Sequence, residues 1–125
     1  QYFDVLRKKP ANFALVSGDD EYTLPVTLAG GSGVISVIAQ GYPKEFSTMV
    51  QLAFDKKVDD AYKIHNKLVE ITRMIFEEGN PSGIKTVLAE IGLIKNYLRL
   101  PLITASDSLQ QRIKLEMTKI ALSDK

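Results

Sequence analysis

The sequence predicts an α/β fold in which two strand–helix units are followed by a region of helices alone. Two short apolar runs bounded by polar residues or glycine indicate strands, and each is followed by apolar residues at helical spacing. From Val58 onward only the helical spacing recurs. Strands that alternate with helices over short links form a parallel sheet, so the carboxyl ends of both strands face the same side. We therefore divide the chain into residues 1–57 and residues 58–125.

The first strand–helix unit follows the end of a preceding helix. Basic residues suit a helix C-terminus and Pro10 stops a helix, so a helix tail is predicted at residues 2–9. The continuous apolar run at residues 13–16 predicts a strand that is buried on both faces. Acidic residues at 19–21 favour the start of a helix because they face the positive end of its dipole, and Gly30-Gly31 is a suitable end for that helix.

The second unit has a buried strand at residues 34–38 and a helix that begins around Pro43, since proline is favoured at the first helical position. In the helical region, one long helix ends at Gly79-Asn80-Pro81. A shorter helix follows it, and Pro101 interrupts the pattern again. The last helix is expected to begin at Ser106 or Asp107, because either side chain can cap a helix N-terminus.

The composition excludes several classes of protein. The 125 residues are 45% hydrophobic and 25% charged, which is the balance of a soluble globular domain. The formal net charge is +1 and the charges are mixed along the chain, which argues against nucleic acid as a partner. The apolar runs are too short to span a bilayer, and no secretory pattern stands at the start. Cysteine is absent, which excludes disulfides and thiolate sites and fits a cytoplasmic protein.

The small number of predicted strands suggests a piece of a larger domain. Two parallel strands leave two open edges, which is uncommon in a sheet that folds independently. The first residue is Gln1 rather than methionine, which also suggests that the start is not a natural one. The alternative is a small α/β domain that dimerises through its sheet.

The segment Ser17-Gly18-Asp19-Asp20 stands where ligand sites gather in parallel α/β folds, at the carboxyl end of a strand. It can form the floor of a pocket, with Gly18 allowing close approach of the backbone to a substrate. It can also be a simple strand-to-helix turn in which Asp19 or Asp20 caps the helix, and pattern alone favours this second interpretation. Adjacent carboxylates on one turn rarely converge on a metal ion, so no metal site is predicted.

Three other features of the sequence are candidates for functional sites, and each is better explained as ordinary structure. Gly30-Gly31-Ser32-Gly33 lacks the lysine and the glycine spacing of phosphate-binding loops, and it precedes a strand rather than a helix. His65, the only histidine, is expected to be a surface or half-buried helix residue. Neither predicted strand contains a lysine that burial could turn into a nucleophile, and Lys85 is predicted to lie on a helix.

Four segments together resemble dihydrodipicolinate synthase, of the N-acetylneuraminate lyase superfamily of class I aldolases. The first two look like the seventh and eighth strands of that family, and the last two resemble its C-terminal helical region. The matching segments are Leu15-Val16-Ser17-Gly18-Asp19-Asp20, Gly30-Gly31-Ser32-Gly33-Val34-Ile35-Ser36-Val37, Asn80-Pro81 with Lys85 downstream, and Leu98-Arg99-Leu100-Pro101-Leu102.

This resemblance implies the last two strand–helix units of a (β/α)8 TIM barrel, at residues 1–57, followed by an all-helical C-terminal region at residues 58–125. A complete barrel needs about 250 residues. The enzymes of this family are cytoplasmic lyases that condense pyruvate with aspartate semialdehyde in lysine and diaminopimelate biosynthesis. The resemblance also implies a homotetramer. A lysine on the sixth strand forms a Schiff base with pyruvate, and no cofactor is involved. That lysine is expected upstream of this chain, so the chain alone, without the missing N-terminal half of the barrel, is expected to be inactive.

The resemblance implies that four residues of this chain belong to the substrate site. Ile35 matches the position whose backbone carbonyl abuts the pyruvate adduct, and Gly18 matches the pocket-lining glycine after the seventh strand. Asp19 and Asn80 are expected to border the route of the second substrate. Two other functions stay open: a non-catalytic α/β-plus-helical assembly or binding module, and a related pyruvate-dependent aldolase with a different acceptor.

Overall fold

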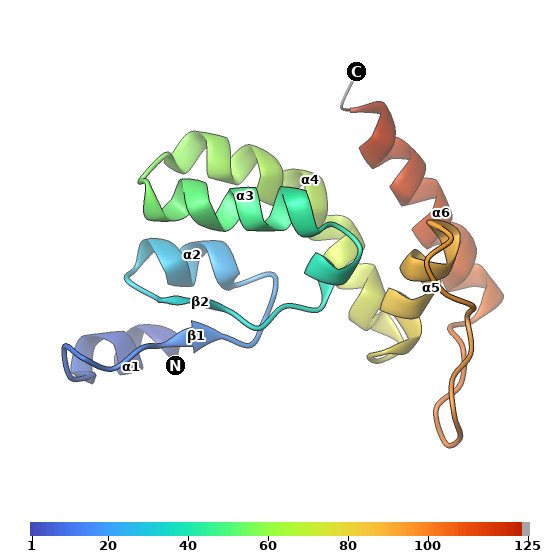
Figure 1. Cartoon of the computed structure of the whole chain (residues 1–125), viewed down its shortest axis with the longest axis horizontal. Helices are drawn as coiled ribbons and strands as arrows, with labels where there is room; N and C mark the ends of the chain where they lie inside the picture. Colours follow the sequence, from blue (N-terminus) through green and yellow to red (C-terminus); the bar gives the residue numbers. More distant parts are fainter. Residues whose placement is uncertain (124–125) are drawn as a thin grey trace. The chain divides into compact units, whose positions relative to one another are not determined.

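The chain forms two compact units that divide after Asn66, and the computed structural model describes residues 1–123 (Figure 1). The first unit contains both strands and the helices around them. The second is helical. None of the helices in the described part of the chain is long and apolar enough to cross a membrane.

The first unit places a small parallel sheet beside a layer of helices. Its elements are α1 (Tyr2–Lys8), β1 (Val16–Ser17), α2 (Thr23–Leu28), β2 (Gly33–Val34), the 3-10 helix η1 (Ile38–Gln40), α3 (Pro43–Phe54) and the first part of α4 (Val58–Glu77). Val16 pairs with Gly33 and Ser17 with Val34, which confirms the predicted parallel arrangement. Helix α2 contacts both strands on one side and α3 on the other (Figure 1).

Apolar residues from the helices of this layer make the core of the first unit. Leu24 and Val26 of α2, together with Phe46 and Met49 of α3, are almost completely buried. Burial of each such side chain stabilises the folded state by roughly 1.5–3 kcal/mol relative to exposure. Pro43 begins α3, as the sequence predicts.

The strands differ from the prediction in length and in burial. Pairing covers two residues in each strand, rather than residues 13–16 and 34–38. Phe13 and Val16 remain 53% and 46% exposed, and Ile35 is 74% exposed, so the prediction of strands buried on both faces was wrong for this chain. The reason is that, among the described residues, each strand has only the other as a neighbour and α2 covers only part of the sheet.

The acidic residues after β1 do not begin a helix, contrary to the prediction. Helix α2 starts at Thr23, and Tyr22 rather than Asp19 or Asp20 stands at its N-cap. Asp19 instead accepts hydrogen bonds from the backbone N–H groups of Glu21 (3.0 Å) and Tyr22 (3.4 Å). The Asp19 side chain thus stabilises a turn at residues 19–22, and α2 begins only after this turn.

The second unit consists of the rest of α4, α5 (Ser82–Glu90) and α6 (Asp107–Leu122). Its core is built from Ile71 and Ile75 of α4, Ile84 and Val87 of α5, and Ile113 of α6, all buried. The break between α4 and α5 falls at residues 78–81, close to the predicted Gly79-Asn80-Pro81.

The prediction of a helical chain from Val58 onward is wrong for residues 91–106. This segment leaves the helices as a long loop (Figure 1) and is tied back by side chains of α5. Ser82 Oγ donates a hydrogen bond to the Ile103 carbonyl at 2.7 Å, and Lys85 Nζ donates to the Tyr97 carbonyl. These bonds satisfy backbone carbonyls that have no helical partner.

Charged side chains connect the ends of α4 and α6. Arg112 donates two hydrogen bonds to Glu77, at 2.7 and 2.8 Å, and holds the pKa of Glu77 below its ordinary value.

Ser106 caps α6, as predicted, because its Oγ accepts from the backbone N–H of Leu109 at 3.2 Å. Ser106 also donates through Oγ and N to the Glu78 carboxylate, at 2.5 and 2.7 Å, and these bonds lower the pKa of Glu78.

Candidate functional site

The carboxyl ends of β1 and β2 bring three of the four predicted site residues into one region of the first unit. Gly18 and Asp19 directly follow β1, and Ile35 directly follows β2. The backbone N–H of Ile35 donates to the Ser17 carbonyl at 2.9 Å, which extends the parallel pairing to the edge of this region. All three residues are exposed, so their surface is available to a ligand or to other parts of a larger protein.

The turn after β1 is held by a local hydrogen-bond network. Ser17 is completely buried, and its Oγ accepts from Asp19 N at 3.1 Å and donates to the Asp19 carbonyl at 2.8 Å. The Tyr2 hydroxyl of α1 accepts from Gly18 N at 3.2 Å. A Cβ atom added to Gly18 would have no atom within 4 Å, so the space beside this glycine is open.

Asp20 connects this turn to the segment that follows β2. One oxygen of its buried carboxylate, Oδ2, accepts from the backbone N–H groups of Val37 at 3.0 Å and Ile38 at 2.9 Å. Ser36 Oγ accepts from Ala39 N at 3.0 Å and supports the same bend. These bonds hold the start of η1 (Ile38–Gln40), which is why the predicted strand at 34–38 ends early.

The fourth predicted residue, Asn80, belongs to the second unit, where it lies exposed between α4 and α5. Its neighbour Pro81 lines a hollow of about 320 Å³ together with Lys85, Leu98, Arg99, Leu100, Pro101 and Leu102. Two of the segments that carry the family resemblance therefore meet in the structure. The guanidinium and ammonium groups of Arg99 and Lys85 give this hollow a positive character.

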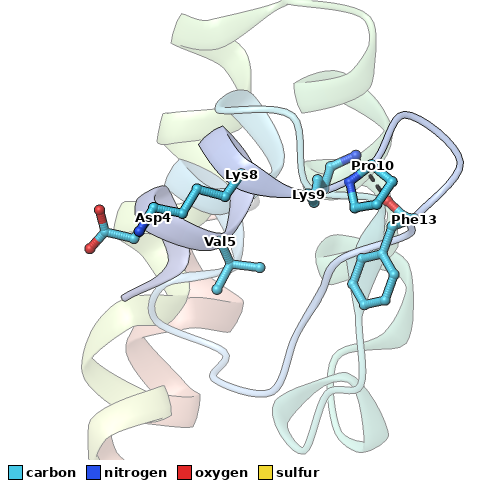
Figure 2. A pocket seen from close by; sticks show the side chains of 6 residues that line it. All are labelled: Asp4, Val5, Lys8, Lys9, Pro10 and Phe13. Carbon is cyan, nitrogen blue, oxygen red and sulfur yellow. Dashed lines mark hydrogen bonds between the residues drawn. The ribbon is translucent and has the colours of Figure 1, made fainter.

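Two further hollows lie on the first unit. One, of about 490 Å³, is lined by Gln1, Tyr2, Val5, Leu15, Asp19 and Tyr22, so it reaches the predicted site through Asp19. The other lies between α1 and the residues before β1, and Figure 2 shows its lining side chains, Asp4, Val5, Lys8, Lys9, Pro10 and Phe13. Lys9 Nζ donates to the Phe13 carbonyl at 2.9 Å, which ties the two walls of this second hollow together. It contains none of the predicted site residues.

The acidic residues of the site do not form a metal centre. Within residues 1–123, no three side chains of the His, Cys, Asp or Glu type lie close enough together to hold a metal ion. Asp19 Oδ1 and Asp20 Oδ2 accept hydrogen bonds from backbone N–H groups rather than facing each other across a shared site. His65 is half-buried on α4, as predicted, with its ring edge-on to Tyr62.

Comparison with known proteins decides the family. The model of the dihydrodipicolinate synthetase family matches residues 1–120. The chain belongs to this family. The resemblance noted in the sequence is thereby confirmed, and it extends over both units of the structure.

The curated relatives carry a consistent description. The 4-hydroxy-tetrahydrodipicolinate synthase of Flavobacterium psychrophilum is 52% identical over 115 residues, which are 92% of this chain and 39% of the relative. The synthase of the same name from Parabacteroides distasonis is 39% identical over 122 residues, which are 98% of this chain and 41% of the relative. The chain thus spans about two fifths of the length of the curated relatives it matches.

Solved structures of the family superpose closely on this chain. Dihydrodipicolinate synthase from Aquifex aeolicus has a TM-score of 0.91 at 29% identity and is matched over 97% of this chain and 41% of its own. The enzyme of Acinetobacter baumannii, described as chloride-inhibited and complexed with pyruvate, has a TM-score of 0.92 at 29% identity, over 96% and 41%. The two-stranded sheet and the helices of this chain therefore correspond to part of the TIM-barrel fold of these neighbours.

Sequence reasoning missed the contact of Tyr2 with the site and the role of Asp20 in it. Tyr2 supports Gly18 from α1, and no local pattern predicts a contact between residues 16 positions apart. The sequence predicts that Asp20 favours a helix start, whereas its carboxylate accepts hydrogen bonds from the N–H groups of residues 17 and 18 positions further along the chain. The sequence did contain a signal for this role. One carboxylate, that of Asp19, is enough to cap the turn, so the adjacent Asp20 is left for another contact.

Proposed function

We propose that this chain is part of a Schiff-base-forming lyase that condenses pyruvate with aspartate semialdehyde in lysine and diaminopimelate biosynthesis. The observation that carries the proposal is the family match over residues 1–120, together with relatives named 4-hydroxy-tetrahydrodipicolinate synthase at up to 52% identity. In this proposal Gly18, Asp19 and Ile35 form one wall of the active site.

The geometry at the ends of the strands supports this assignment. The Ile35 carbonyl is proposed to face the pyruvate adduct, and the open space beside Gly18 suits a substrate that approaches the backbone closely. Asp19 lines the hollow of about 490 Å³, in keeping with a place on the route of the second substrate. Asn80 is assigned to the same route by its match to the family pattern.

The nucleophile is proposed to lie outside the residues of this chain. A lysine that forms a Schiff base at neutral pH needs burial or a nearby positive charge to lower its pKa. None of the lysines among residues 1–123 is buried, and the ammonium group of Lys85 donates a hydrogen bond to the Tyr97 carbonyl. The chain by itself is therefore expected to supply a wall of the site and to be inactive.

Trapping of the Schiff base tests the proposal. Borohydride reduces the adduct between lysine and pyruvate to a stable product that intact mass spectrometry detects. We expect no adduct on this chain alone. We expect an adduct on a fusion protein in which the part of the Flavobacterium psychrophilum synthase that precedes the matched region is joined to this chain. A gel-filtration profile and a circular dichroism spectrum establish that the fusion protein is folded.

Two results would contradict the proposal. An adduct on the isolated chain would place the nucleophile among its own lysines. A folded fusion protein that forms no adduct would show that this chain does not complete a pyruvate site. Condensation with aspartate semialdehyde, measured on the fusion protein, then separates the proposed synthase from a pyruvate-dependent aldolase with another acceptor.

The remaining features of the proposed enzyme follow the family. We propose that it acts in the cytoplasm as a homotetramer with pyruvate and aspartate semialdehyde as its substrates and without a cofactor. The alternative of a self-standing binding module is disfavoured by the exposed apolar residues of the strand region, Phe13, Val16 and Ile35. Such exposed strands promote aggregation unless another part of a protein covers them.

A further inference from the structure

The buried carboxylate of Asp20 joins the two loops at the carboxyl ends of β1 and β2. Asp20 is only 3% exposed, and its Oδ2 accepts from Val37 N at 3.0 Å and from Ile38 N at 2.9 Å. Hydrogen bonds from N–H groups to an ionised acceptor are stronger than those between neutral groups. Asp20 therefore provides a strong link between segments that are 17 and 18 residues apart.

This link acts on the peptide that carries the Ile35 carbonyl. On one side of that peptide, the N–H of Ile35 donates to the Ser17 carbonyl at 2.9 Å. On the other side, the N–H groups of Val37 and Ile38 are held by Asp20. With anchors on both sides, the Ile35–Ser36 peptide has little freedom to rotate, although the Ile35 side chain itself is mostly exposed.

Asp20 occupies this position at a cost in free energy. Its second oxygen, Oδ1, is buried and has no hydrogen-bond partner among the described residues. Burial of an unpaired carboxylate oxygen is unfavourable, and an apolar side chain would not carry that cost. A turn alone does not require a buried charge here, since Ser36 Oγ already caps the bend through Ala39 N.

We propose that Asp20 is a positioning residue that fixes the direction of the Ile35 carbonyl in the pyruvate site. The inference rests on the function proposed above and assigns to Asp20 a role through Ile35 rather than a contact with substrate. Displacement of a positioned group by about 1 Å can reduce catalysis by on the order of a hundredfold. Loss of the two hydrogen bonds is thus expected to weaken pyruvate binding without removal of any group that reacts.

Two substitutions in the fusion protein separate geometry from charge. In Asp20→Asn the amide oxygen can still accept from both N–H groups, so the loop is expected to stay in place. In Asp20→Ala both acceptors are lost. Thr86→Val is the matched control, because it removes a buried hydroxyl that donates to the Ser82 carbonyl at 3.2 Å in the second unit.

Hydrogen exchange and kinetics provide the two readouts. In Asp20→Ala we expect the amides of Val37 and Ile38 to lose protection and KM for pyruvate to rise on the order of tenfold or more. In Asp20→Asn we expect both amides to remain protected and KM to stay within about threefold, so that the conservative variant rescues the function. In Thr86→Val we expect neither the exchange of these amides nor KM to change.

The proposal fails if Asp20→Ala leaves the two amides protected, or if it exposes them while KM and kcat stay at the values of Thr86→Val. It also fails if Asp20→Asn keeps the protection but loses pyruvate binding as fully as Asp20→Ala, since charge rather than position would then matter. A folded, unsubstituted fusion protein that forms no borohydride-stable adduct refutes the proposed function, and this role with it. The adduct thus distinguishes that failure from a failure of the Asp20 assignment alone.

Discussion

Substitution of Gly83 by alanine is predicted to destabilise the second unit through a clash with the backbone of α4. Gly83 lies in the first turn of α5 and is buried. A Cβ atom at this position would lie 2.4 Å from both Cα and the carbonyl oxygen of Ile75. Carbon atoms in contact are normally about 3.5 Å apart, so α4 and α5 would have to separate by about 1 Å.

The magnitude of the effect follows from two opposed contributions. Alanine is favoured over glycine in a helix by about 1 kcal/mol. Overpacking against a backbone that cannot move aside costs about 3 kcal/mol, at the upper end of values for well-packed cores. The net loss in the free energy of unfolding is therefore about 2 kcal/mol. With a urea dependence of about 2 kcal/mol per molar, the unfolding midpoint should fall by about 1 M.

Urea unfolding followed by circular dichroism measures this change directly. Gly18→Ala is the matched control, because it makes the same chemical change where a Cβ would meet nothing within 4 Å. We expect its midpoint to stay close to that of the unsubstituted chain. If Gly83→Ala is as stable as the unsubstituted chain or more stable, the close approach of α5 to α4 at Ile75 is wrong.

Two further predictions concern the link between α4 and α6. Ser106→Ala should lower the free energy of unfolding by about 1 kcal/mol through loss of the N-cap, as measured by urea unfolding, whereas Ser106→Thr should restore most of it. The Ser106→Asp variant should regain less than Ser106→Thr, since its carboxylate would lie beside Glu78; equal stability of the two would contradict this geometry. Arg112 lowers the pKa of Glu77 in the folded state. The ion pair therefore adds fully to the free energy of unfolding above the unfolded pKa of Glu, about 4.3, and this contribution is lost as the pH falls through the lower pKa of the folded state. Thermal unfolding between pH 3 and pH 7 should accordingly show a shallower acid-side decline in Glu77→Gln, with a smaller difference from the unsubstituted chain at high salt. An unchanged pH profile would show that the ion pair adds nothing to stability.

The sequence determined the features that depend on local chemistry. Pro43 begins α3 because its fixed φ suits the first helical position and its missing N–H is not needed there. Ser106 caps α6 because its hydroxyl reaches the N–H of Leu109 three residues later. The glycine and proline at residues 79–81 end α4 for equally local reasons. The family resemblance came from short segments in the right order, and the match over residues 1–120 confirmed it.

The tertiary structure alone decided the features that depend on residues far apart in the chain. The strand predicted at residues 34–38 ends after Val34 because the Asp20 carboxylate takes two of its amides, and helical or strand periodicity contains no information on that acceptor. The exposure of Val16 and Ile35 likewise depends on which elements cover the sheet, not on how apolar the strands are. The candidate site follows the same division. Gly18, Asp19 and Ile35 were recognisable from sequence, whereas the roles of Tyr2 and Asp20 required the fold, because side-chain hydrogen bonds between distant residues form only where packing brings donor and acceptor within about 3 Å.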